Sequence, residues 1–169
     1  FYDFPTVQQM ADTIATDLGK ADPKHAAEFT KNAATFNKAV DKLIAQEATI
    51  KAAAAGTPIA ITEPVPLYLT AAAGLVNKTP AKFSVAIEEG SDMSASVLDE
   101  TLALYRNKEV KALVYNQQTS GPVTEKFKAA AKKAGIAIVP VTETLPAGDD
   151  YLKWMSDNLR ALAAAVDNG

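Results

Sequence analysis

The pattern of apolar positions changes near Gly56. Before Gly56, apolar residues recur at helical spacing, which predicts an amphipathic helix over residues 5–18. A longer helix is predicted to begin at Asp22-Pro23 and to end before Gly56. The apolar stripe of the first helix consists of Val7, Met10, Ile14 and Leu18.

After Gly56, short β-rich runs alternate with helical segments. The predicted strands are 58–62, 82–87, 111–115 and 136–141, and the predicted helices lie near 65–75, 95–107, 121–134 and 149–166. Such alternation is typical of right-handed βαβ units with helices on both faces of a parallel sheet. We therefore predict a three-layer α/β lobe with a roughly four-stranded parallel sheet, preceded by the two helices.

Composition narrows the class of protein. The chain has 169 residues, of which 48% are hydrophobic and 22% charged, as expected for a globular protein with one core. Its net charge of -3 provides no basic surface, so we expect no nucleic-acid partner. The absence of cysteine excludes thiolate metal sites and disulfides. Because the chain begins at Phe1 without an initiator Met, we expect a processed or truncated product.

An apolar run that ends in Thr-Glu occurs twice, and it places Glu63 and Glu143 after two predicted strands. The carboxyl ends of parallel strands share one edge of a sheet, where ligands commonly bind. Pro64 restricts the backbone of Glu63 to an extended conformation, which suits a metal ligand. A single loop carboxylate is more often solvated, but two at one edge favour a convergent site.

Two other polar residues, Asn116 and His25, have side chains that can bind ligands. Asn116 ends the third predicted strand, so it is placed to hydrogen-bond a ligand or a carboxylate, although Asn is also a common turn residue. His25 is the only histidine, and its position in the first turn of the long helix predicts a surface residue. Because no glycine-rich loop follows a strand, the dinucleotide fingerprint and the phosphate loop are absent.

The residues alone leave three functions open. Two carboxylates at a sheet edge can bind a divalent metal, or they can act as acid and base in a small glycosidase-like hydrolase. The fold also suits a flavodoxin-like interaction module.

Several motifs, taken in order and spacing, resemble one family over essentially the whole chain. They are residues 1–6, 22–29 with Asn32-Ala33, 87–90, 114–117 and 150–159. The chain resembles the C-terminal half of the zinc- and manganese-specific solute-binding proteins of bacterial ABC importers, in which a rigid helix joins two α/β lobes. By this resemblance, residues 1–22 are a remnant of the interlobe linking helix and residues 23–169 form the C-terminal metal-binding lobe.

The resemblance implies a substrate-binding component that captures zinc or manganese between two lobes and is not an enzyme. Glu63 and Glu143 match two of the four metal ligands of the family. The other two are histidines, one from the N-terminal lobe and one expected immediately upstream of Phe1. We therefore expect metal binding by this chain alone to be weak or absent.

The resemblance also implies partners and a location. The partners are the membrane permease of the ABC transporter and the N-terminal lobe. Because helix 5–18 would lose half of its contacts without that lobe, we expect self-association through this helix. The expected location is periplasmic or extracellular, at the cell envelope.

Overall fold

The computed structural model describes residues 1–167. Within this range, the strands form one four-stranded parallel sheet in the order β2-β1-β3-β4. The strands are β1 (Pro58–Ile61), β2 (Val76–Asn77), β3 (Ala112–Asn116) and β4 (Ala137–Val141). The helices are α1 (Phe4–Ala21), α2 (Ala26–Ala54), α3 (Leu67–Ala72), α4 (Ala81–Glu89), α5 (Ala95–Arg106), α6 (Pro122–Lys133) and α7 (Tyr151–Val166). The predicted α/β lobe with a parallel sheet is confirmed.

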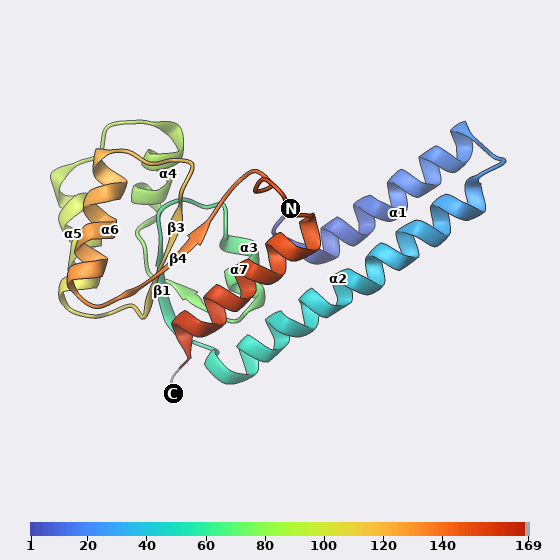
Figure 1. Ribbon diagram of the computed structural model, residues 1–169. Helices are drawn as coiled ribbons and strands as arrows, with labels where there is room; N and C mark the ends of the chain where they lie inside the picture. Colours follow the sequence, from blue (N-terminus) through green and yellow to red (C-terminus); the bar gives the residue numbers. More distant parts are fainter. Residues whose placement is uncertain (168–169) are drawn as a thin grey trace.

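Each face of the sheet carries its own apolar core, because successive side chains of a strand point to opposite faces. One core joins β1, β3 and β4 to α2 and α7, with Ile59, Val114 and Met155 buried in it. The other core lies under α4, α5 and α6 and includes Phe83 and Phe127, whose ring centroids are 4.4 Å apart. Figure 1 shows α5 and α6 on one side of the strands and α2 and α7 on the other.

Helices α1 and α2 form an antiparallel hairpin that projects away from the sheet (Figure 1). With 29 residues, α2 is about 44 Å long at 1.5 Å per residue. Its C-terminal half packs on the sheet and α7, whereas its N-terminal half contacts α1. The predicted apolar stripe of α1 is therefore only partly covered: Val7 is buried, whereas Met10, Ile14 and Leu18 are 54%, 50% and 45% exposed.

The predicted strand at 82–87 is wrong, because this segment forms α4. Phe83, Val85 and Ile87 alternate as in a strand, but Val85 is 41% exposed while Phe83 and Ala86 are buried at helical spacing. Pro80 precedes the helix and Gly90, in the left-handed conformation, ends it. The sheet still has four strands, because β2 takes the place of the predicted strand at 82–87. It has two residues and pairs with β1 at one edge of the sheet.

The other predicted helices and strands are present, with boundaries that differ by a few residues. The assignment of residues 1–22 to a linking helix and of residues 23–169 to a lobe remains a prediction. No helix within residues 1–167 has the length and apolar content needed to cross a membrane.

Candidate functional site

Three polar residues meet at the carboxyl-terminal edge of the sheet. Glu63 follows β1 after Thr62, Asn116 is the last residue of β3, and Glu143 comes two residues after β4. Because β1 and β4 both pair with β3, the two carboxylates reach Asn116 from either side. The backbone N–H of Asn116 also donates to the Thr62 hydroxyl at 3.0 Å, which ties the ends of β1 and β3 together. The structure therefore brings together the three residues that the sequence singled out.

The amide of Asn116 lies between the two carboxylates. Its Oδ1 accepts from the backbone N–H of Gln118 at 3.0 Å, and this bond fixes which end of the amide faces the site. Its Nδ2 then donates to Glu63 Oε2 and, at 2.5 Å, to Glu143 Oε1. The Thr119 hydroxyl lies 3.0 Å from the same nitrogen. One amide group thus holds two acidic side chains at a fixed spacing.

The site is negatively charged and partly enclosed. Glu63 is 3% exposed and Asn116 is 1% exposed, whereas Glu143 is exposed at the rim. Among residues 1–167, no lysine, arginine or histidine forms an ion pair with either carboxylate. Two like charges in contact with one amide repel each other, and a bound cation would relieve this repulsion.

Each carboxylate has one oxygen that accepts no hydrogen bond from the described residues. These atoms are Glu63 Oε1 and Glu143 Oε2, and they are the oxygens available to a cation. Within residues 1–167, no group of three or more His, Cys, Asp or Glu side chains is arranged to hold a metal ion. The site therefore offers two carboxylate ligands, and any further ligands must be water or groups from outside this range.

Gln118 connects the two loops that carry the site, a role that no pattern in the sequence predicts. Its Oε1 accepts from the backbone N–H groups of Glu143 and Thr144, at 2.6 and 3.0 Å. Its Nε2 donates to the Thr144 hydroxyl at 2.5 Å. Gln118, in the loop after β3, therefore holds the backbone of Glu143 in place.

Tyr2 anchors the start of the chain beside the same loop. Its hydroxyl donates to the Thr142 carbonyl at 2.9 Å and accepts from Asn158 Nδ2 at 3.2 Å. Burial raises the pKa of Tyr2 to about 12, so the hydroxyl stays protonated and remains a donor at neutral pH. In Figure 1 the N-terminus accordingly lies near the start of α7 and the loop after β4.

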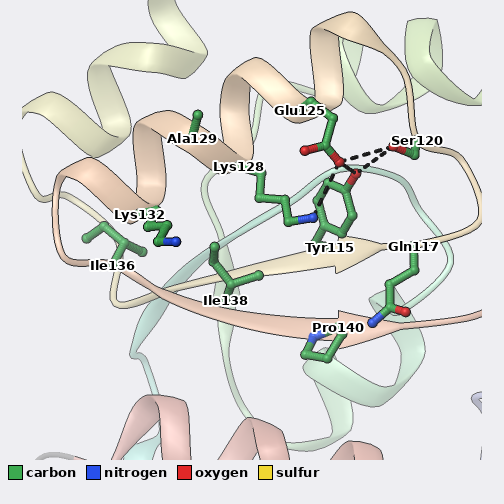
Figure 2. Close-up of a pocket in the computed structure, with 10 residues that line it drawn as sticks. All are labelled: Tyr115, Gln117, Ser120, Glu125, Lys128, Ala129, Lys132, Ile136, Ile138 and Pro140. Atoms are coloured by element: carbon green, nitrogen blue, oxygen red, sulfur yellow. Dashed lines mark hydrogen bonds and ion pairs between the residues drawn. The ribbon is translucent and has the colours of Figure 1, made fainter.

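A cavity of about 900 Å³ lies beside the site, between α6 and the edge strand β4 (Figure 2). Glu125 in this cavity accepts from the hydroxyls of Tyr115 and Ser120, at 2.6 and 3.1 Å, and its pKa is lowered mainly by the Tyr115 bond. Lys128 lies 4.5 Å from the centre of the Tyr115 ring and 3.3 Å from Glu125. These polar groups already satisfy one another, and neither Glu63 nor Glu143 lines the cavity.

His25 lies in the turn between α1 and α2, at the end of the hairpin away from the sheet (Figure 1). Its Nδ1 is 2.7 Å from Asp22 Oδ2, and both side chains are exposed. The predicted surface position of this histidine is confirmed.

Residues 1–165 match the family described as zinc-uptake complex component A, periplasmic. The chain belongs to this family. Among curated proteins, no sequence matches the chain. The family resemblance found in the sequence is thus confirmed.

Solved structures share the fold at low sequence identity. The laminin-binding adhesin Lmb of Streptococcus agalactiae superposes with a TM-score of 0.78 and 23% identity, over 98% of this chain and 61% of Lmb. The Mn²⁺ complex of FpvC from Pseudomonas aeruginosa superposes with a TM-score of 0.72 and 23% identity, over 98% of this chain and 61% of FpvC. A Zn(II)-bound mutant variant of AdcAII from Streptococcus pneumoniae superposes with a TM-score of 0.76 and 22% identity, over 98% of this chain and 58% of AdcAII. The chain thus spans less than two thirds of the length of these relatives.

Proposed function

We propose that this chain is the C-terminal lobe of a substrate-binding component of an ABC importer that captures zinc or manganese. In this proposal Glu63 and Glu143 are metal ligands, and Asn116 positions them. The observation that carries the proposal is the convergence on one amide of two carboxylates that form no ion pair within residues 1–167, in a chain of a zinc-uptake family. Two proteins of the same fold, FpvC and a mutant variant of AdcAII, have structures with bound Mn²⁺ and Zn(II), respectively.

The donor set suits a transition metal once it is completed by nitrogen ligands. Carboxylate oxygens are hard donors that both Mn²⁺ and Zn²⁺ accept, and two imidazoles would bring the coordination number to four. The proposed imidazoles belong to two histidines outside this chain, one in the N-terminal lobe and one directly upstream of Phe1. The bond from Tyr2 to Thr142 supports the second of these positions, because it holds the start of the chain beside the Glu143 loop.

Binding is better supported than catalysis. A glycosidase-like hydrolase needs a sugar between its two carboxyl groups, but here the Asn116 amide occupies that space and Glu63 is 3% exposed. The family is described as an uptake component, a role that requires capture of a ligand rather than its conversion. We therefore infer a protein that is not an enzyme, works with a membrane permease and acts in the periplasm or at the outer face of the cell envelope.

Calorimetric titration of the full-length protein with Zn²⁺ and Mn²⁺ tests this proposal. Glu63→Ala and Glu143→Ala are each expected to weaken metal binding by more than about tenfold, because each removes a ligand. Asn116→Ala is expected to weaken it about 10- to 100-fold, as for other residues that orient ligands. His25→Ala is the control and should bind like the wild type. Unchanged affinity in both glutamate variants, with circular dichroism showing an intact fold, would refute the assignment.

A further inference from the structure

A buried carboxylate of a different kind lies at the base of the α1–α2 hairpin. Glu47 of α2 is 5% exposed, and its Oε1 is buried without a hydrogen-bond partner. The residue lines a cavity of about 310 Å³ that neither Glu63 nor Glu143 lines. Other lining residues are Tyr2, Asp3, Phe4, Ile44 and Tyr68. A buried acceptor left unpaired destabilises a fold, so this position calls for a ligand or another compensating group.

The charges around this cavity are acidic. Burial and, to a smaller extent, the nearby charge of Asp3 raise the pKa of Glu47 to about 7. Asp3 accepts a 2.6 Å bond from the Thr6 hydroxyl through Oδ2, and within residues 1–167 neither Asp3 nor Glu47 forms an ion pair. Tyr151 interacts electrostatically with both carboxylates and with Tyr2, and Tyr2, Tyr68 and Lys51 are the other titratable side chains that line the cavity.

Lys51 also lines the cavity, one helical turn beyond Glu47, but it does not neutralise the carboxylate. The stem of Lys51 packs over Gly74, where an added Cβ would lie 2.8 Å from Lys51 Cγ. The side chain is therefore held over the loop after α3, and its ammonium group makes no ion pair with Glu47.

We propose that this cavity binds an ammonium group. The N–H donors of an ammonium ion can supply hydrogen bonds to Glu47 Oε1 and Asp3 Oδ1, which accept none from residues 1–167, and its charge opposes theirs. Tyr2, Phe4 and Tyr68 line the same space, and aromatic rings are groups that attract cations. A metal ion is disfavoured, because only two carboxylates line the cavity and the described residues hold no group of three metal-ligating side chains.

The ammonium group can come from two sources, a free small amine or a lysine side chain from outside residues 1–169. The cavity volume lies near the lower limit of small-molecule sites, which suits a ligand as small as methylamine. The test therefore compares this chain with the full-length protein.

The probe is methylammonium chloride, with sodium chloride at equal ionic strength as the control. We expect a saturable rise in the melting temperature of chain 1–169, of about 3 °C at ten times the Kd. The single tryptophan, Trp154, lies 5.9 Å from the ring of Tyr2 and provides an independent fluorescence readout. Glu47→Gln, which keeps the side-chain shape, should abolish both responses, and Asp3→Asn should weaken binding several-fold. Glu28→Gln, at an exposed position of the same helix, should leave both unchanged.

Two outcomes would overturn the proposal: an equal response to sodium, or a methylammonium response that survives in Glu47→Gln and Asp3→Asn. The full-length protein distinguishes the two sources. If methylammonium binds it as it binds the shorter chain, the ligand is a free amine. If only the shorter chain responds, a basic side chain of the longer protein occupies the cavity.

Discussion

Asn116 holds two acidic side chains together with one amide, so its loss should affect stability as well as binding. Asn116→Ala removes the donor to buried Glu63 and to Glu143. We expect the free energy of unfolding to fall by about 1–3 kcal/mol, the cost of leaving a buried acceptor unpaired. Urea denaturation measures this change. Asn32→Ala, at an exposed helical position, is the control and should change stability by less than about 0.5 kcal/mol. Equal stability of the two variants would contradict the role given to Asn116.

Glu47 should make the stability of the fold depend on pH. Its pKa rises from 4.5 to about 7 on folding, so between these values the folded state binds more protons than the unfolded state. The stability that protonated Glu47 contributes is therefore present below about pH 4.5 and is lost as the pH rises through 7. With no amine present, Glu47→Gln should be more stable than the wild type at pH 8 by about 1–3 kcal/mol, and similar to it at pH 5. Parallel stability profiles of the two proteins from pH 5 to 8 would refute this prediction.

The positions of the three site residues are predictable from the sequence, because the order of strands and helices alone places them. Glu63, Asn116 and Glu143 lie together because each comes at or just after the end of a parallel strand, which the apolar pattern reveals. Gln118 and Tyr2 were not predictable as parts of the site. Their partners lie 25 and 140 residues away, and only the folded chain brings those loops into contact.

Among the elements, the error at 82–87 has a simple physical origin. An alternating apolar run of six residues also places its outer members at helical spacing, so the pattern alone does not decide between a strand and a helix. The strand that the pattern missed, β2, has two residues and is too short to show any period. Longer elements such as α2 and α7 repeat their pattern over several turns and were predicted from it.

The α1 helix presents Met10, Ile14 and Leu18 as an apolar surface, which favours association with a second copy of the chain. We expect the isolated chain to self-associate as its concentration rises, and a variant with Glu at all three positions to remain monomeric. Sedimentation velocity measures the change. Because these side chains are about half exposed, the free energy of unfolding should change by less than about 0.5 kcal/mol per site.

The control for this prediction is a variant with Glu at Gln9, Thr13 and Thr16, which are exposed on α1 outside the apolar stripe. It adds the same charge to the same helix and should associate like the wild type. A wild-type chain that stays monomeric at high concentration would contradict the role of the stripe.

For the whole molecule, the sequence predicted the layers of the lobe because their apolar pattern is internal to the chain. The proposed metal site, by contrast, depends on ligands from outside this chain. The chain covers 61% of Lmb and 58% of AdcAII, so the remaining length of such proteins is available for further ligands. Within residues 1–167 the two acidic side chains that meet at the edge of the sheet are Glu63 and Glu143, too few to complete a metal site.

The isolated chain should therefore bind Zn²⁺ and Mn²⁺ only weakly, since two carboxylates leave most coordination positions to water. In the isolated chain, Glu143→Gln should change the free energy of unfolding little, because removal of one of two like charges offsets the lost hydrogen bonds.

Calorimetric titration of chain 1–169 is expected to give a metal affinity at least about a hundredfold below that of the full-length protein, given that structural zinc sites with four ligands bind far more tightly. Tight, stoichiometric binding by the isolated chain that disappears in His25→Ala would instead place the metal site at the tip of the α1–α2 hairpin.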